Sequence, residues 1–243
     1  MSSTTHEFDL LLFDNDGTLT NSTPGVAAAW DKFGKEYNFD GKEAEDSTHG
    51  MRLLDSMKKW CQIEDQDKLV AEVNRFEAAV IEGGPVPLPG VPELLVQASS
   101  MTQLDLGLTV AAAQVRRTDG PTWLGGLHER WYATQVLEKV GVGKPEVLVT
   151  SEDVQRGKPH PDPYLEGAYK CGFEGPDYSK VLVFEDAVSG IASGKAAGMK
   201  VLALQTTTPR EALHALDPDF LVPDMTHVSV EWKNNKWLVT VRD

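Results

Sequence analysis

The segment that most constrains this chain is 14–18, Asp-Asn-Asp-Gly-Thr, which ends the apolar run 8–13. A short apolar run that stops at a turn signal is typical of a buried strand. Ligands bind at the C-terminal ends of strands in open α/β sheets. The sequence therefore predicts that Asp14 and Asp16 emerge together at a sheet edge, where they can act as nucleophile and proton donor. The alternative is an ordinary Asx-rich turn that carries no site.

The composition is compatible with a globular enzyme. The 243 residues suffice for one large domain, or for a core domain with a smaller one. A formal net charge of −14 argues against a nucleic-acid or anionic-membrane partner, because either would require a basic face. An anionic small substrate remains compatible with this charge, since a bound cation and a lysine can reverse the sign locally.

The expected location is the cytoplasm. Cys61 and Cys171 are too few for a disulfide framework, which favours free thiols in a reducing compartment. No apolar segment is long enough to span a bilayer, and residues 1–7 lack the basic and apolar parts of a signal peptide. We also expect a monomer.

Strand-like and helix-like stretches alternate along the chain, which predicts an α/β fold with a parallel sheet and right-handed crossovers. The stretch 20–83 is helical throughout and ends at a Gly/Pro-rich linker. We therefore expect a core formed by 1–19 and 84–243, with 20–83 as a small helical domain. Residues 228–241 alternate around Asn-Asn and predict a C-terminal β-hairpin. Further core strands are expected at 104–110, 146–150, 180–184 and 200–204.

Two further motifs follow expected strands. Lys158, in Gly-Lys-Pro-His-Pro-Asp-Pro-Tyr, precedes a proline and is thereby held extended. A lysine there is a suitable point charge for a phosphoryl oxygen or a carboxylate, although a solvated lysine on a Pro-rich loop is the alternative. Glu185 and Asp186 end another apolar run and could cap the next helix. Brought to one edge, Asp14, Asp16 and Asp186 would instead offer the hard oxygen ligands that Mg²⁺ selects.

These motifs, in this order and at these strand ends, resemble the phosphatase branch of the haloacid dehalogenase superfamily. The segments 47–52, 157–164 and 183–198 look more closely like the glycerol-phosphate and 2-deoxyglucose-6-phosphate phosphatases. The resemblance covers roughly 9–222. It implies a Rossmann-like parallel core, with 20–83 as a helical cap inserted after the first strand.

The resemblance also implies roles for individual residues. Asp14 matches the nucleophile that forms an aspartyl-phosphate, and Asp16 matches the general acid/base. Lys158 would neutralise charge on the nucleophile and the phosphate. Mg²⁺ would be held by Asp14, Asp186 and the backbone carbonyl of Asp16, with Glu185 as a support or alternate ligand. The chemistry is consistent, because a metal and a lysine remove the repulsion between a carboxylate and a phosphate dianion.

The implied function is Mg²⁺-dependent hydrolysis of small polyol or sugar phosphates. Thr18 is expected to contact the substrate. His49 and Arg52 are the candidates for specificity contacts from the cap, with a solvated helix terminus as their alternative. A sugar-phosphate mutase, or a phosphatase-like binding protein with impaired turnover, is the alternative function.

One departure from the family pattern lies at 109–129. The family ends its second core strand with Ser or Thr followed by Gly-Thr, which holds the phosphate, and this tripeptide is missing here. Genuine divergence and a misread gene model would both produce this sequence. Thr109 and Thr118 are the candidate substitutes. We expect 109–129 to be an inserted surface loop and turnover to be slow, because losing one such donor costs roughly 10²–10³ in rate.

Overall fold

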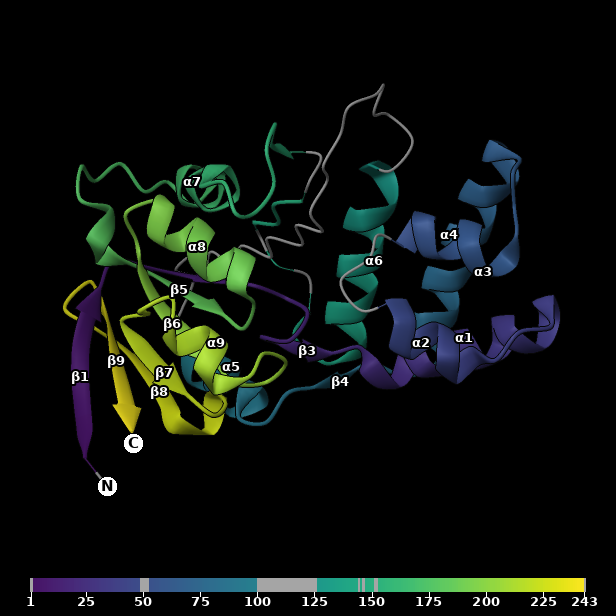
Figure 1. Ribbon diagram of the computed structural model, residues 1–243. Helices are drawn as coiled ribbons and strands as arrows, with labels where there is room; N and C mark the ends of the chain where they lie inside the picture. The colour runs from purple at the N-terminus through teal and green to yellow at the C-terminus, as the bar shows by residue number, and fades with distance from the viewer. Residues whose placement is uncertain are drawn as a thin grey trace.

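A computed structural model describes residues 2–48, 53–99, 126–143, 145, 147–150 and 153–242 of the chain. Its centre is a parallel sheet with the strand order β2-β5-β6-β7 (Figure 1). This confirms the α/β fold with a parallel sheet. The strands are β2 (Leu10–Phe13), β5 (Val181–Glu185), β6 (Lys200–Leu204) and β7 (Phe220–Val222).

Both faces of this sheet are buried, as its nearly continuous apolar strands require. Along β2, Leu11 and Phe13 face one hydrophobic cluster, and Leu10 and Leu12 face another. The first cluster includes residues of α5 (Val91–Ser99) and α6 (Gly126–Lys139). The second includes residues of the helices α7 (Asp162–Lys170), α8 (Val188–Ala196) and α9 (Arg210–His214). Packing on both faces therefore fixes the positions of the strand ends.

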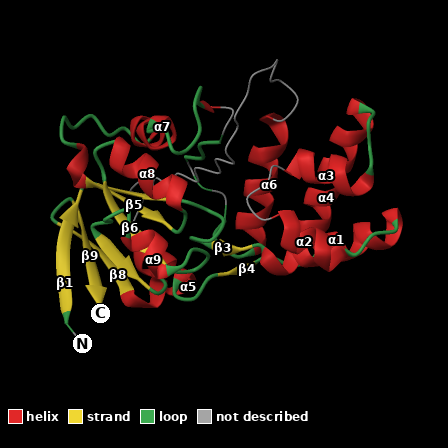
Figure 2. Ribbon diagram, viewed as in Figure 1, coloured by secondary structure: helices red, strands yellow, loops and turns green. Residues whose placement is uncertain are grey.

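A helical segment follows the first strand of this sheet and builds its own hydrophobic cluster. Trp30, Phe33, Met57, Leu69 and Phe76 are members of that cluster. In Figure 2 these helices lie to one side of the sheet. The short strands β3 (Thr20–Asn21) and β4 (Val86–Pro87) pair where the chain enters and leaves the segment. The helices are α1 (Thr23–Tyr37), α2 (Gly41–Thr48), α3 (Leu53–Cys61) and α4 (Gln66–Glu82).

A second, antiparallel sheet has the order β1-β9-β8. The strands β8 (Val228–Lys233) and β9 (Lys236–Arg242) form the expected hairpin, and both asparagines of its turn have positive φ. The strand β1 (Ser3–Phe8) was not expected, because its sequence is mostly polar. The apolar run 8–13 is consequently divided between two sheets at Asp9, which forms an ion pair with Lys236.

Two further predictions from the sequence differ from the structure. Residues 147–149 are not part of an extended strand, and Thr150 takes part only in an isolated bridge. Side chains engage this stretch, since Arg130 donates to the Leu148 carbonyl at 2.9 Å and the Thr150 amide donates to Asp153 at 2.7 Å. The helix α6 begins at Gly126, so the end of the expected loop 109–129 is helical. The expected strand at 104–110 lies outside the described residues.

Among the helices in the described part of the chain, none has the length and apolar character needed to cross a membrane.

Candidate active site

The turn after β2 places Asp14 at the C-terminal end of the parallel sheet. The Asp14 amide still donates to the Phe184 carbonyl of β5 at 3.0 Å, so Asp14 continues the line of the strand. The chain then turns sharply, because the Asn15 carbonyl accepts from the amides of Leu19 and Thr20 at 2.8 and 3.0 Å. Gly17, with φ of +88°, supplies the left-handed conformation that this turn needs.

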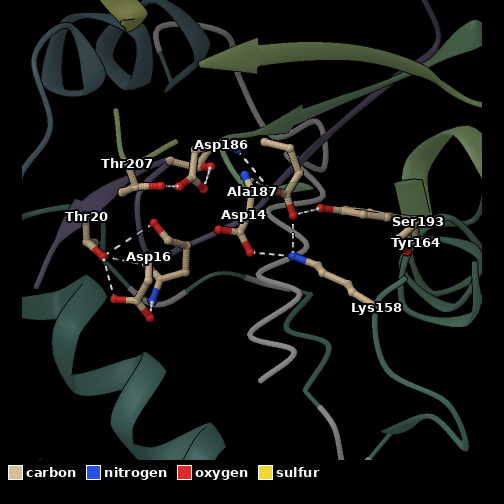
Figure 3. Close-up of polar contacts among 12 residues, drawn as sticks. Asp14, Asp16, Thr20, Lys158, Tyr164, Asp186, Ala187, Ser193 and Thr207 are labelled. Atoms are coloured by element: carbon tan, nitrogen blue, oxygen red, sulfur yellow. Dashed lines mark hydrogen bonds and ion pairs between the residues drawn. The ribbon is translucent and has the colours of Figure 1, made fainter. Parts of the chain in front are cut away.

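Lys158 links the ends of β2 and β5. Its Nζ donates to Asp14 Oδ1 at 2.6 Å and to Glu185 Oε1 at 2.5 Å (Figure 3). The Tyr164 hydroxyl donates to the same Glu185 oxygen at 2.7 Å. Lys158 is 4% exposed and Glu185 is fully buried, so the lysine is not a solvated loop residue. The Pro-rich segment therefore delivers a buried cation to the carboxylate at position 14.

The two acids after β5 have different surroundings. Glu185 Oε2 accepts from the backbone amides of Asp186 and Ala187 at 2.9 and 3.0 Å, so both Glu185 oxygens are engaged. Asp186 accepts from the hydroxyl of Thr18 at 3.2 Å and from that of Thr207. It does not cap α8, whose N-cap is Ala187. Glu185 thus lies in a supporting position, and Asp186 is oriented by hydroxyl groups.

The buried charges of this cluster do not balance, since three carboxylates share one lysine. Burial raises the pKa of Asp14 well above its usual range, although Lys158 opposes this shift. Burial and the neighbouring Glu185 raise the pKa of Asp186 to about 7. For Lys158, burial is outweighed by Asp14 and Glu185, which raise its pKa. The site therefore favours one more positive charge.

Asp16 lies two residues beyond Asp14 and is exposed to solvent. Its carboxylate accepts from the Thr20 hydroxyl at 3.4 Å and from the Asn15 amide at 3.5 Å (Figure 3). Although the residue as a whole is exposed, nearby protein lowers the solvation of its carboxyl group and raises its pKa, while the hydroxyls of Ser22 and Thr20 oppose the shift. A carboxyl with a raised pKa is better suited to donating a proton near neutral pH.

The donor set of this cluster fits a divalent metal ion. Oxygens of Asp14, Glu185 and Asp186 all lie within 4.8 Å of one another. Carboxylate oxygens are the ligands that Mg²⁺ prefers. Because Glu185 is engaged by Lys158, Tyr164 and two amides, Asp14 and Asp186 are the carboxylates best placed to hold the ion.

The structure brings most of the predicted residues together. One connected network of hydrogen bonds contains Asp14, Thr18, Lys158, Glu185 and Asp186. Asp16 lies on the same turn as Asp14. Within this network Thr18 bonds to Asp186 rather than standing free for a substrate. His49, Arg52, Thr109 and Thr118 lie outside the described residues.

Two members of the network were missed. Tyr164 is the last residue of the Gly157–Tyr164 motif, and its hydroxyl lies on Glu185. Thr207 follows the C-terminal end of β6, in a run of three threonines. Polar residues beyond the end of the next parallel strand are the signal that could have revealed Thr207.

Gly17→Ala should damage the site locally. A Cβ at Gly17 would lie 2.2 Å from Asp186 Oδ2, in a backbone conformation that alanine disfavours by about 1–2 kcal/mol. We expect at least a tenfold loss of activity from displacement of Asp186. Gly172→Ala is the matched control, because Gly172 also has positive φ but its Cβ would meet nothing within 4 Å. Equal losses in the two variants, measured as activity and thermal midpoint, would contradict the assigned position of Asp186.

Comparisons with known proteins agree with this geometry. A family model described as haloacid dehalogenase-like hydrolase matches residues 8–198. Glycerol-1-phosphate phosphohydrolase 2 of Saccharomyces cerevisiae is 31% identical over 227 residues, which cover 90% of this chain and 83% of that protein. The 2-deoxyglucose-6-phosphate phosphatase 2 of the same yeast is 30% identical over 237 residues, covering 95% and 94% of the two chains.

Solved structures share the fold. A HAD family hydrolase of Deinococcus radiodurans, crystallised with bound phosphate and sodium, has a TM-score of 0.62 and 23% identity over 90% of this chain and 92% of that chain. The family match spans most of the sequence and includes the acids and the lysine of the site. The chain therefore belongs to the haloacid dehalogenase-like hydrolases, as a phosphatase related to the glycerol-phosphate and 2-deoxyglucose-6-phosphate enzymes.

Proposed function

We propose that this protein hydrolyses small polyol or sugar phosphate monoesters through an aspartyl-phosphate on Asp14, with Mg²⁺ as its cofactor. The observation that carries the proposal is the bond of 2.6 Å from Lys158 to Asp14, beside Asp186 at one sheet edge. The named substrates of the yeast relatives support the substrate class. We further propose that residues 20–83 act as a cap over this edge, with 1–19 and 84–243 as the core.

In the first step, a carboxylate oxygen of Asp14 attacks the phosphorus of the ester. The bond from phosphorus to the ester oxygen breaks, and Asp16 gives its proton to that oxygen, so that a neutral alcohol leaves. Lys158 holds Asp14 in place by its bond to Oδ1 and lowers the repulsion between the nucleophile and the phosphate. Asp14 then carries the phosphoryl group, and Asp16 is ionised.

In the second step, Asp16 accepts a proton from a water molecule that attacks the phosphorus. The bond between the Asp14 oxygen and phosphorus breaks, which releases inorganic phosphate and restores both aspartates to their starting states. The solvent exposure of Asp16 gives it access to water. One carboxyl thereby serves as the acid in one step and the base in the other.

We propose that Mg²⁺ is held by Asp14, Asp186 and the backbone carbonyl of Asp16. Thr18 and Thr207 would keep Asp186 in its ligand orientation. When bound, the ion would supply positive charge that compensates the excess of buried carboxylates. Glu185 acts through Lys158 as a positioning residue.

Metal removal is the direct test of the cofactor. Dialysis against EDTA should lower phosphate release roughly 100-fold or more, because a catalytic metal supplies several kcal/mol of stabilisation. Addition of Mg²⁺ should restore the rate. Undiminished hydrolysis in EDTA would show that the acidic cluster works without a metal ion.

The substrate class is tested by a screen of small phosphate monoesters with Mg²⁺, using inorganic phosphate as the readout. We expect the fastest release from phosphorylated polyols or sugars. The same reactions, analysed for isomerised sugar phosphate, distinguish hydrolysis from the mutase alternative. Ligand binding without phosphate release would instead support an impaired, phosphatase-like binding protein.

A further inference from the structure

Tyr164 lies at the edge of the site, and the proposed steps give it no role. It is fully buried, and its ring belongs to the hydrophobic cluster of Leu12 and Val183 on one face of the sheet. Its hydroxyl donates to Glu185 Oε1 at 2.7 Å, and Lys158 Nζ lies 5.2 Å from the centre of its ring (Figure 3). One side chain therefore contacts both members of the ion pair that Lys158 and Glu185 form.

The carboxylate of Glu185 is held by donors at both of its oxygens and has no room to turn. Oε1 accepts from Lys158 and Tyr164, and Oε2 accepts from the next two backbone amides. Helix α8 passes so close that a Cβ at Gly190 would lie 1.6 Å from Oε1. Glu185 is also closed off from solvent, because its surface is fully buried. Within the described residues, Tyr164 is thus the one group that shares Oε1 with the lysine.

The ammonium of Lys158 lies between two carboxylates that compete for it. Its Nζ is 2.6 Å from Asp14 Oδ1 and 2.5 Å from Glu185 Oε1. The hydroxyl of Tyr164 shares the electron density of the Glu185 oxygen, and this sharing reduces the attraction of that oxygen for the ammonium. The competition matters most once Asp14 has bonded to phosphorus, because the Asp14 carboxyl then carries less negative charge while Glu185 keeps its own.

We propose that Tyr164 is a positioning residue that acts through Glu185 to keep Lys158 on Asp14 and on the phosphoryl group that Asp14 receives. The inference rests on the proposed function, and it adds a residue to the machinery of that site. Without the hydroxyl, Glu185 Oε1 would keep Lys158 as its only side-chain donor and would draw the ammonium away from Asp14. A displacement of about 1 Å in a catalytic group can cost roughly 10²-fold in rate, so the effect on turnover should be large even though the hydroxyl acts through its neighbours.

The test is a double-mutant cycle of Tyr164→Phe and Glu185→Gln, with kcat measured on p-nitrophenyl phosphate in the presence of Mg²⁺. Tyr164→Phe removes one oxygen and keeps the ring in its packing. In the wild-type background it should lower kcat at least about tenfold. In the Glu185→Gln background it should cost less than about twofold, because a neutral amide oxygen exerts little attraction on the ammonium. Such coupling is expected of two residues that act as a unit, whereas a packing role would cost the same factor in both backgrounds.

Tyr178→Phe is the matched control. Tyr178 packs against the same hydrophobic cluster, but it precedes β5 and so lies at the end of that strand opposite Glu185. This variant should keep the wild-type kcat, and thermal midpoints check the fold of every variant. Binding is followed separately as the inhibition constant of inorganic phosphate, which should change less than about threefold in Tyr164→Phe.

An unchanged kcat in Tyr164→Phe overturns the role of Tyr164, and so does an equal fold-loss in the two backgrounds. Where Glu185→Gln is too slow to measure, the inhibition constant decides: retained phosphate affinity with a lowered kcat supports the role, and a matching loss of affinity overturns it. In each of these cases the wild-type activity stands, and with it the proposed function. No phosphate release by the wild-type protein from any ester of the screen or from p-nitrophenyl phosphate refutes both together.

Discussion

Asp14→Asn should abolish phosphate release, with a loss of roughly 10³-fold or more, as is typical when the nucleophile of a covalent mechanism is removed. The amide is a far weaker nucleophile than a carboxylate. It is also a poorer metal ligand and cannot pair with Lys158 as an anion. The rate is measured as phosphate released from the best ester of the screen, at saturating Mg²⁺.

Asp9→Asn is the control for this variant. Asp9 lies just before the same strand, and its carboxylate pairs with Lys236 rather than with the site. The control should keep full activity, while the fold of both variants is checked by circular dichroism. Retention of more than a small percentage of activity in Asp14→Asn would eliminate an aspartyl-phosphate on this residue.

Lys158→Met should be the most destabilising single change at the site. The buried ammonium lies between Asp14 and Glu185, so its removal leaves two buried carboxylates facing each other. Breaking a buried ion pair from one side costs about 3–5 kcal/mol of unfolding free energy. Urea unfolding of the metal-free protein measures this loss, and phosphate release should fall as well.

The double variant Lys158→Met with Glu185→Gln separates stability from catalysis. Neutralising Glu185 removes one of the two uncompensated charges, so a large part of the lost unfolding free energy should return. Activity should not return, because Asp14 still lacks its cation. Recovery of activity in the double variant would show that Lys158 serves the fold only, and would remove it from the mechanism.

The positions of the acidic residues could be predicted from local sequence patterns. An apolar run that ends in acids is enough to place Asp14 and Asp186 at strand ends, and parallel pairing then brings them together. No local pattern places Lys158 beside Asp14, since the two residues are 144 positions apart in the sequence and meet only in the fold. The motif suggested the chemistry, and burial by neighbouring elements made the contact.

The parts that could not be predicted depend on partners distant in sequence. Nothing in the polar sequence of β1 indicates a strand, because β1 becomes extended only by pairing its backbone with that of β9. Thr207 and Tyr164 are unremarkable until the sheet places them beside Asp186 and Glu185. For 147–150, in contrast, a strand was predicted that does not form. Its apolar pattern is typical of a strand, yet only Thr150 takes part in a bridge, and Arg130 and Asp153 bond to the Leu148 carbonyl and the Thr150 amide.

The pairing of β1 with β9 has a consequence for how the protein is made. Ser3 lies opposite Arg242, so contacts of nearly the greatest possible sequence separation close the second sheet (Figure 1). Such pairs form late, because closing so long a loop costs entropy before any contact repays it. During synthesis, β1 must wait outside the ribosome as an unpaired strand until β9 emerges. The proposed nucleophile, Asp14, follows six residues after β1 ends, so its turn is synthesised early but is held on that side only when the second sheet closes.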